Sequence, residues 1–581
     1  MVAAPPSATE APRAARSPEG VPESRGLNLF AADPSYRGLL ELHLEPRLCA
    51  HLLPHFTRLG AMAGAELDEL ALTADKNPPI LNGQKIAKSK AYEKLEEAAF
   101  GDFGLAALSH RGGVLGWPQP MPPAAKYALS YVYVQAEFGV CCPLSMTDAL
   151  TRTIRKFADP ALVARYLPGL TSQDMDTLTQ GAMFITEQQA GSDVGSIRTL
   201  ASKEGDHWLL SGDKWFCSNV DAGLALVLAR PEDAPAGTAG LSLFLLPRTL
   251  PDGSPNRYRI SRLKEKLGTR AMPSGEIKME SALAWLVGDP RQGFKQMADM
   301  INMSRLSNGM RAAGLMRRAL TEALYVARNR EAFGKKLIEL PLMRRQLLKL
   351  MLPAEAARSI LFFISNDLEK ADAGDESARR RVRLLTPLIK FRACRDARRA
   401  TGDAMEVRGG VGYTEEWSDP RLVRDAHLGS IWEGTSNIVA LDVLRAIRRE
   451  HCLEALLPEL NGRIERAPRL LAGRLAASLD KAAEFAHEVA STGSDAHARQ
   501  AATGLYYACA AALLADEGTR LAERGDARRQ LIAFLAYVHR LAPRDPLRRV
   551  TTGFESEFAE ALLPETPIAP DAAERILTRL A

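Results

Sequence analysis

The feature that most limits how this chain can fold is a stretch of strand-like sequence between two helical regions. From about Gly26 to Gln180 the spacing of apolar residues is typical of helices. From about Gly181 to Asp289, short apolar segments alternate with Gly, Pro, Asp and Asn at the spacing of an all-β domain. We expect strands at His207–Leu210, Lys214–Cys217, Leu224–Ala229, Leu241–Pro247, Arg257–Ile260 and Glu276–Met279. A helical pattern returns near Gln292, so a small β-domain separates two helical regions.

This order predicts an α+β fold in several parts. We expect a disordered tail over 1–25, an N-terminal helical domain over 26–180 and a middle β-domain over 181–290. A C-terminal helical bundle over 291–450 and an extra helical domain over 451–581 complete the prediction. The tail is rich in Ala, Pro, Ser and Glu and lacks the apolar centre of a secretory signal.

Composition excludes several classes of protein. Hydrophobic residues are 46% and charged residues 25%, as in ordinary globular proteins. No apolar run approaches the roughly 18 residues of a membrane span, so we expect no membrane partner. The net charge of +5 is small for 581 residues and indicates no particular partner. Seven scattered cysteines without a CxxC pair predict a reducing, cytoplasmic location. We expect no metal site, because His51 and His55 lack a third ligand.

Two segments at the start of the predicted β-domain carry residues suited to a cofactor wall. In the first, Thr186 and Ser192 supply hydroxyls, and Gly191 allows a ligand to approach the backbone closely. The second is the next strand, Gly212–Asn219. Either segment alone fits an ordinary loop and strand. About 25 residues apart at a junction between helix and sheet, they favour a wall for a planar cofactor.

Through these and three further motifs the sequence resembles the acyl-CoA dehydrogenase family. The motifs stand in order as Thr186–Asp193, Gly212–Asn219, Arg330–Gly334, Glu406–Gly412 and Trp432–Thr435. The resemblance covers about Gly26 to Glu450 and implies the family's fold, FAD as cofactor, and oxidation of an acyl-CoA thioester between Cα and Cβ. It also implies a homo-oligomer, for which we expect a tetramer.

Breaking the two C–H bonds of such a substrate requires a base and a hydride acceptor. A side chain can take the weakly acidic α-proton, and a flavin takes the β-hydride. The base works best as a carboxylate in a mostly apolar pocket, where lost hydration favours its protonated form. Glu433, flanked by Ile431, Trp432 and Gly434, matches the family base; a salt-bridged loop glutamate is the alternative.

Some family members carry their base on the helix that holds Met300–Met310, but that stretch has no carboxylate here. Arg305 in this stretch matches a family arginine that contacts the CoA part of the substrate. An ordinary salt bridge on a helix is the alternative for Arg305.

The resemblance also implies which residues bind FAD. Those near the flavin and its ribityl chain are Thr186, Gly191, Ser192, Phe216 and Ser218. Those near the adenosine and pyrophosphate are Glu406, Gly409, Gly410, Thr435 and Asn437. Arg330 and Phe333 would reach the FAD of a neighbouring subunit, with the guanidinium on the pyrophosphate.

Departures from the common pattern point to one branch of the family. Trp432 replaces a usual Tyr, Glu406 replaces a usual Gln, and helical sequence continues past Glu450. These features resemble the AidB-type alkylation-response branch, which is associated with FAD, weak acyl-CoA dehydrogenase activity and DNA binding. The bulk of Trp432 beside the base predicts a pocket for short or branched acyl chains.

Two functions therefore stand as alternatives. The first is an acyl-CoA dehydrogenase that passes electrons to an electron-transfer flavoprotein or a similar acceptor, with an acyl-CoA oxidase as its variant. The second is a flavoprotein whose main role is to bind double-stranded DNA independently of sequence. Residues 451–581 contain 16 Lys and Arg against 18 Asp and Glu, which does not favour DNA. Locally, the arginine-rich runs Arg520–Arg549 and Arg379–Arg399 fit either a phosphate-binding surface or a solvated helix face.

Overall fold

The computed structural model describes residues 21–543 and 553–580, which form two compact units. One, the β unit, comprises residues 69–122 and 137–307. The other, the helical unit, comprises the described residues of 1–68, 123–136 and 308–581. Helix α8 (Gly293–Asn329) contributes its first residues to the β unit and the remainder to the helical unit.

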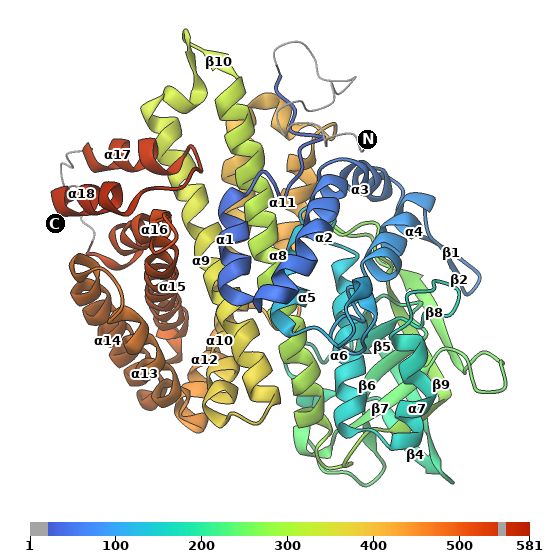
Figure 1. Ribbon diagram of the computed structural model, residues 1–581. Coiled ribbons are helices and arrows are strands. Elements are labelled where there is room, and N and C mark those ends of the chain that lie inside the picture. The colour runs from blue at the N-terminus through green and yellow to red at the C-terminus, as the bar shows by residue number, and fades with distance from the viewer. Residues whose placement is uncertain (1–20, 544–552, 581) are drawn as a thin grey trace. The chain divides into compact units, whose positions relative to one another are not determined.

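A seven-stranded sheet organises the β unit (Figure 1). Its strands are β3 (Gly181–Phe184), β4 (Leu200–Glu204), β5 (His207–Ser218), β6 (Leu224–Pro231), β7 (Ser242–Pro247), β8 (Tyr258–Leu263) and β9 (Ser274–Leu286). The strands pair in the order β3-β6-β4-β5-β9-β7, with β8 on β9 and a further pairing of β6 with β7. Five strands, β6, β4, β5, β9 and β7, therefore close into a ring, which leaves few unpaired edges.

Apolar side chains from these strands fill the centre of the β unit. Phe184, Leu210, Val227, Phe244 and Ile277 are among the residues of this core, and each is at most 1% exposed. The strand segments expected from the sequence fall on β5 to β9, although Leu241 and Arg257 lie one residue before β7 and β8, and the first two segments join in β5. β3 and β4 were not predicted, because β3 has four residues and β4 is mostly exposed.

The β unit also contains helices and a small hairpin. Its helices are α4 (Lys90–Glu96), the π-helical turn η1 (Glu97–Asp102), α6 (Cys141–Phe157), α7 (Pro160–Leu170) and most of α3 (Glu66–Lys76), and its hairpin is β1 (Ile80–Asn82) with β2 (Lys85–Ala87). The hairpin was not expected within the N-terminal helical region. The apolar residues between Ala125 and Leu150 form two helices rather than one. The chain turns between them because the Glu137 carboxylate accepts the N–H groups of Gly139 and Val140 just before α6.

Long helices make up most of the helical unit (Figure 1). They are α1 (Pro34–His43), α2 (Pro46–Gly64), α5 (Pro123–Tyr133), α9 (Pro341–Asp372), α10 (Glu376–Arg408), α11 (Ser418–Gly429) and α12 (Ser436–Glu450). The C-terminal helices are α13 (Cys452–Ile464), α14 (Arg469–Thr492), α15 (Ala498–Ala522), α16 (Arg528–Ala536), the π-helical turn η8 (Tyr537–Leu541), α17 (Gly553–Leu562) and α18 (Pro570–Leu580). Helix α15 packs against α9, α12, α14 and α16. Among the described helices, none is both long and apolar enough to cross a membrane.

A chain of buried ion pairs connects the C-terminal helices to the rest of the helical unit. Four guanidinium groups alternate with four carboxylates, and all eight residues are at most 4% exposed: Arg317, Arg358, Arg528, Arg529, Asp33, Glu355, Glu517 and Glu565. Arg529 lies 2.6 Å from Glu355 on α9 and 2.8 Å from Glu517 on α15. Arg317 on α8 lies 2.7 Å from Glu565. Removing one partner of such a pair leaves an uncompensated buried charge, which costs about 3–5 kcal/mol.

This chain of ion pairs corrects one expectation from the sequence. Arg528 and Arg529 were expected on an exposed face, either a phosphate-binding surface or a solvated helix face, but each is only 1% exposed. The two arginines begin helix α16, and Arg529 is buried against Glu517 and Glu355. The sequence shows the charge of these residues but not their burial. Of the same run, Arg544, Arg548 and Arg549 lie outside the described residues.

We predict that Glu517→Gln lowers stability at neutral pH and flattens its loss in acid. Burial raises the pKa of the Glu517 carboxyl, but Arg529 and the hydrogen bonds from His43 and Ser359 lower it to about 2. The folded-state pKa lies below the ordinary value of 4.5, so the carboxylate stabilises the fold above pH 4.5 and loses that contribution as pH falls toward 2. Linkage gives roughly 3 kcal/mol for this difference.

The measurement is urea unfolding of wild type and variant at several pH values between 7 and 3. Glu484→Gln, which removes an exposed carboxylate on α14, is the matched control and should follow the wild type. A variant curve parallel to the wild-type curve over the whole range would contradict the assigned role of Glu517.

Candidate active site

The first predicted cofactor motif is fixed to the sheet by a buried ion pair. Glu187 is 4% exposed, and its carboxylate lies 2.8 Å from the Lys214 Nζ on β5. The same carboxylate accepts hydrogen bonds from the N–H groups of Arg198 and Thr199 and from the Thr199 hydroxyl. Burial lowers the pKa of Lys214, and the charge of Glu187 only partly offsets this effect. Burial raises the pKa of Glu187, but Lys214 and these hydrogen-bond donors outweigh it, so the pKa of Glu187 is lowered. The Glu of the first motif and the Lys of the second are therefore structural.

Gly212 allows the loop to lie close to β5. Its φ is 147°, and a Cβ there would come within 2.8 Å of the Thr199 hydroxyl and 2.9 Å of the Thr199 Cα. A side chain would push the loop away from the strand, which explains a glycine at this position.

A β-bulge in β5 turns Phe216 toward the surface. Lys214 pairs with Ile277 and Cys217 with Gly275, so the partner strand β9 is one residue shorter over this interval. Strict alternation would place Lys214 and Phe216 on the same face. Instead Lys214 and Cys217 are buried, and Phe216 is 56% exposed.

Three hydroxyl groups lie on the segments around this exposed ring. Thr186 and Ser218 are half-buried, and Ser192 is exposed. Among the described residues, none of the three side chains makes a hydrogen bond, and a Cβ at Gly191 would meet nothing within 4 Å. Unpaired hydroxyls next to an exposed aromatic ring fit a planar ligand with a polar chain.

Arg305 also falls in the β unit, on the first part of α8. It is half-buried, and its Nη1 lies 3.4 Å from the Asn302 Oδ1.

In the helical unit, Glu433 lies in the turn between α11 and α12. Its φ is 48°, a left-handed conformation that is rare for residues other than glycine and is typical of functional sites. Its Oε2 accepts a hydrogen bond of 2.7 Å from the Asn308 amide, and Lys390 donates to the backbone oxygen of Gly434. These contacts fix the turn on two sides.

The surroundings of Glu433 differ from the apolar pocket that the sequence led us to expect. Within the helical unit the carboxylate is half-buried and bonded to an amide. Arg311 and Lys390, each at most 1% exposed, contact Trp432 and Gly434, the residues on either side. Burial raises the pKa of the nearby Cys394 thiol to about 11, although the positive charges of Lys390 and Arg311 lower it.

The hairpin β10 (Glu331–Ala332) and β11 (Lys335–Lys336) carries the next motif. Phe333 and Gly334 form its two-residue turn with φ values of 56° and 72°, as in a type I′ turn. Phe333 is 92% exposed at the tip, which projects at the top of Figure 1. At the base of the hairpin, Arg330 donates a 2.6 Å hydrogen bond to the backbone oxygen of Arg408.

That bond brings Arg330 next to the glycine motif. Arg330 Nη1 would lie 3.5 Å from a Cβ at Gly409. Gly409 and Gly410 follow the end of α10 and are exposed, as is Glu406. Arg408 itself is 2% exposed and pairs with Asp419 at 2.9 Å, which fixes the end of α10.

Thr435 and Asn437 lie at the start of α12, directly after the Glu433 turn, and both are exposed. Thr435 is the N-cap residue, yet its side chain makes no capping hydrogen bond, so its hydroxyl is directed elsewhere. The structure thus assembles Trp432, Glu433, Thr435 and Asn437 in one turn and helix start.

Asn308, Arg311 and Lys390 were missed in the sequence. Each lies in a long helix far from Glu433 along the chain, so spacing gives no hint of the contact. The available signal was a pair of polar residues, Asn308 and Arg311, at i and i+3 on an otherwise apolar stretch of α8.

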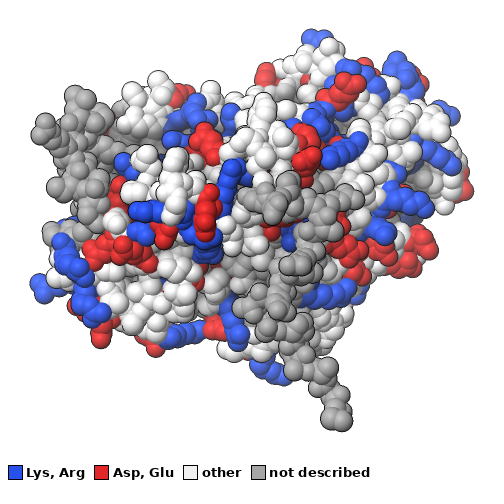
Figure 2. Space-filling model, turned by 90° about the horizontal axis from the view of Figure 1, so that it is seen from above, with Lys and Arg blue, Asp and Glu red and all other residues white. Residues whose placement is uncertain are grey.

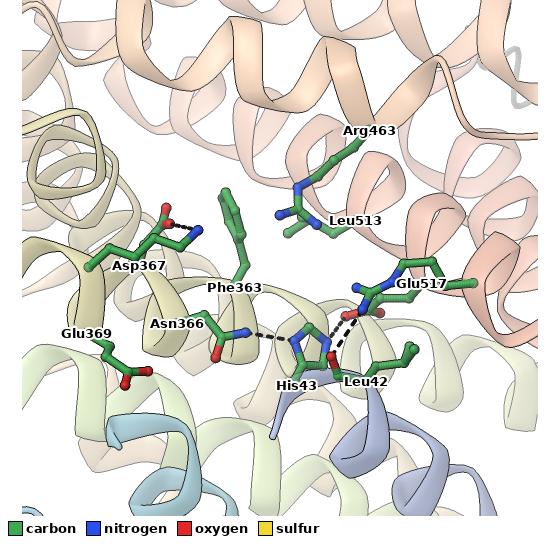
Figure 3. A pocket seen from close by; sticks show the side chains of 11 residues that line it. Leu42, His43, Phe363, Asn366, Asp367, Glu369, Arg463, Leu513 and Glu517 are labelled. Carbon is green, nitrogen blue, oxygen red and sulfur yellow. Dashed lines mark hydrogen bonds and ion pairs between the residues drawn. The ribbon is translucent and has the colours of Figure 1, made fainter. Parts of the chain in front are cut away.

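A separate cavity of about 290 Å³ lies in the helical unit and contains none of the predicted site residues. Figure 3 shows His43 between Asn366 and Glu517, with nitrogen contacts of 2.9 Å and 3.0 Å. The buried acids of its wall, Asp367 and Glu517, pair with Arg381 and Arg529. These two buried carboxylates are therefore already compensated by arginines.

Comparison with known proteins places these segments in a family. Family models match residues 20–177 (adaptive response protein AidB N-terminal domain), 182–282 (acyl-CoA dehydrogenase, middle domain) and 291–448 (acyl-CoA dehydrogenase, C-terminal domain). The putative acyl-CoA dehydrogenase AidB of Escherichia coli (strain K12) is 35% identical over 411 residues, or 68% of this chain and 74% of that protein. The chain belongs to the acyl-CoA dehydrogenase family.

Two further relatives agree with this membership. Acyl-CoA dehydrogenase family member 11 of Caenorhabditis elegans is 31% identical over 432 residues, which cover 71% of this chain and 69% of that protein. The crystal structure of C. elegans ACDH-11 in complex with C11-CoA has a TM-score of 0.82 at 25% identity and covers 92% of this chain and 95% of that one. The family fold and the AidB-like resemblance expected from the sequence are confirmed. As a family member, the chain is an oxidoreductase acting on acyl-CoA.

We predict that Lys214→Met destabilises this family member by about 3–5 kcal/mol, because Glu187 is left charged and buried. The double variant Lys214→Met/Glu187→Gln should recover part of that loss, since neither charge remains. The measurement is chemical unfolding of wild type, both single variants and the double variant.

The control is an exposed ion pair of the same unit. Lys278 and Glu280 are 45% and 59% exposed and lie 3.4 Å apart on β9. Lys278→Met should change stability by no more than about 1 kcal/mol. Equal effects at the two lysines would show that the Glu187–Lys214 pair has no special role.

Proposed function

We propose that the protein is an FAD-dependent acyl-CoA dehydrogenase in which Glu433 removes the α-proton of a short or branched acyl-CoA. The observation that carries this proposal is a carboxylate presented from a left-handed turn and bonded to the buried amide of Asn308. Backbone strain at a single acidic residue is typical of a functional position. When bound, FAD accepts the hydride that leaves the β-carbon.

The residues suited to FAD support this cofactor. In the β unit we assign the flavin and its chain to Thr186, Gly191, Ser192, Phe216 and Ser218. In the helical unit we assign the adenosine and pyrophosphate to Glu406, Gly409, Gly410, Thr435 and Asn437. The hydroxyls without partners, the exposed Phe216 ring and the exposed glycines fit these roles. Family members are flavoproteins, which agrees with this assignment.

The acyl end of the substrate is assigned to Trp432 and the CoA end to Arg305. Trp432 donates its indole N–H to Asn308 at 2.5 Å, and Arg311 lies 4.8 Å from its ring centroid. A side chain fixed in this way yields little space to a long chain. The C. elegans relative was solved with C11-CoA, so a test must include longer chains.

The hairpin tip supports an oligomer. Phe333 has a left-handed backbone, and its aromatic side chain is 92% exposed to solvent. Both features are unfavourable for an isolated chain, and contact with another subunit would offset them. We propose that Arg330 and Phe333 reach the FAD of a neighbouring subunit in a homotetramer. We further propose an electron-transfer flavoprotein or similar acceptor, with oxygen as the acceptor in the oxidase alternative. The cysteines of the described residues form no disulfide, which supports a cytoplasmic location.

We predict that Glu433→Gln retains FAD and loses reduction of the flavin by substrate. The amide has nearly the same shape as the carboxylate but does not accept the α-proton, so the rate should fall by about three or more orders of magnitude. The measurement is the loss of flavin absorbance on anaerobic mixing with butyryl-CoA, isovaleryl-CoA and longer straight-chain acyl-CoAs.

If Glu433→Gln reduces its flavin at the wild-type rate, another residue must be the base. In the wild type, four- and five-carbon substrates should bleach the flavin faster than long straight chains, and the reverse order would contradict the role given to Trp432. Glu415→Gln, at a half-exposed carboxylate near the start of α11, is the control and should leave the rates unchanged.

Binding of double-stranded DNA is a second candidate function, favoured by one observation. Arg395, Arg398 and Arg499 lie near one another on α10 and α15, and the pKa of Arg395 is lowered by its burial and by Arg499, Arg392 and Arg398. Arg395 and Arg398 reach the hydroxyls of Ser436 and Ser430 rather than carboxylates. Such mutual repulsion fits a polyanionic partner.

The remaining basic residues support this candidate less. Arg381 is buried with Asp367, and Arg383 pairs with Asp442 and Glu450. On the face seen in Figure 2, basic and acidic side chains of the described residues are interspersed rather than gathered by sign. The part of this face that the structure describes therefore offers no large basic patch to DNA.

We predict that Arg395→Gln/Arg398→Gln/Arg499→Gln flattens the salt dependence of duplex binding. Each lost phosphate contact lowers the slope of log affinity against log salt by about 0.9. The control is Arg379→Gln/Arg380→Gln/Arg445→Gln, which removes exposed arginines that pair with carboxylates of their own helices. Failure to retain any duplex at about 50 mM salt would exclude this function.

A further inference from the structure

One buried amide contacts both the proposed base and the aromatic residue beside it. Asn308 on α8 is 1% exposed. Its Nδ2 donates to the Glu433 Oε2 at 2.7 Å, and its Oδ1 accepts from the Trp432 Nε1 at 2.5 Å. Trp432 and Glu433 are adjacent in sequence, so a single side chain fixes two consecutive residues of a strained turn.

The chemistry of the indole decides which end of the amide faces Glu433. An indole N–H only donates, so it pairs with the amide oxygen of Asn308. The amide nitrogen is thereby directed at Glu433, where it donates to the carboxylate. Without the Trp432 donor, the amide could rotate so that its oxygen accepts from a protonated Glu433, whereas an ionised carboxylate still requires the amide nitrogen.

Helix α10 fixes the position of this amide. A Cβ at Gly309 would lie 2.9–3.0 Å from the Ile389 side chain, so α8 and α10 approach closely at this point. The Cys394 thiol donates to the backbone oxygen of Asn308 at 3.6 Å. Lys390, one turn earlier on α10, donates to the backbone oxygen of Gly434. Helix α10 thus contacts both the amide and the turn that carries the base.

Arg311 completes the support from α8. It lies one turn after Asn308, on the same face of the helix, with its guanidinium 4.8 Å from the Trp432 ring centroid. The groups around the Glu433 turn thus include the Asn308 amide and Arg311 from α8, and Lys390 and Cys394 from α10.

We propose that Asn308 is a positioning residue that orients the Glu433 carboxylate and the Trp432 ring together. This inference rests on the proposed role of Glu433 as base. The donated hydrogen bond favours the ionised carboxylate, the form that accepts the α-proton. The bond of Asn308 to Trp432 keeps this donor directed at the base.

The test is the pH dependence of flavin reduction by butyryl-CoA in Asn308→Leu, a variant of similar volume without a donor. A hydrogen bond to a charged group corresponds to about one pH unit or more. We expect the midpoint of the rate profile to rise by about one unit, the rate well below the wild-type midpoint to fall about tenfold, and the rate at high pH to recover. A purely structural role would lower the rate at all pH values equally.

Trp432→Phe provides a second route that leaves Asn308 in place. It removes the donor that orients the amide, so the midpoint should move in the same direction by a smaller amount. Asn77→Leu, at an exposed amide directly after α3 that donates to the backbone oxygen of Thr73, is the control and should show the wild-type profile. Flavin absorbance of each variant verifies that the holoenzyme has formed.

The outcomes separate this inference from the proposed function. If Glu433→Gln is inactive while Asn308→Leu and Trp432→Phe keep the wild-type midpoint, the positioning role is overturned and the base remains. If Glu433→Gln reduces its flavin at the wild-type rate, the proposed function itself is wrong. If Asn308→Leu does not retain flavin, an unshifted midpoint in Trp432→Phe overturns the inference by itself.

Discussion

The arrangement of the helical unit depends on buried charges that must meet opposite charges. In one group, Arg529 joins Glu355 of α9 to Glu517 of α15. In a second group, Arg408 at the end of α10 pairs with Glu322 of α8 at 2.7 Å and with Asp419 of α11 at 2.9 Å. Apolar packing tolerates small sliding of helices, but an unpaired buried charge is too costly to tolerate. These pairs therefore fix the register of one helix against the next.

The same constraint places the segments that carry the site. Arg408 is the last residue of α10, so its two buried pairs fix the point from which Gly409 and Gly410 follow. Arg330 in turn bonds to the Arg408 backbone. In the β unit, the Glu187–Lys214 pair fixes a loop against a strand, and the bulge next to it exposes Phe216. Several residues of the family motifs thus act by positioning their neighbours rather than by touching a ligand.

Much of the fold was predictable because it follows from local periodicity. The change from helical to strand-like spacing near Gly181 located the sheet, and the motifs located the Glu433 turn. Local pattern did not reveal the short, mostly exposed strand β4 or the contact of Asn308 with Glu433, which joins helix α8 to a turn 125 residues further along the chain. The exposure predicted for Arg528 and Arg529 was wrong, because a run of arginines has the same sequence pattern whether it faces water or buried carboxylates.

The buried ion pairs of the helical unit restrict which substitutions the sequence can accept. In the chain of pairs that contains Arg529, four guanidinium groups meet four carboxylates, and six of the eight groups have two partners within it, with Arg528 and Glu517 at the ends. Loss of one member strands a neighbour, whereas a simultaneous change of two partners leaves the total neutral. Viable descendants would accumulate changes at these positions in correlated steps, for instance at Glu565 together with Arg317. The interior of this unit would then drift more slowly than its apolar neighbours, and in coupled pairs.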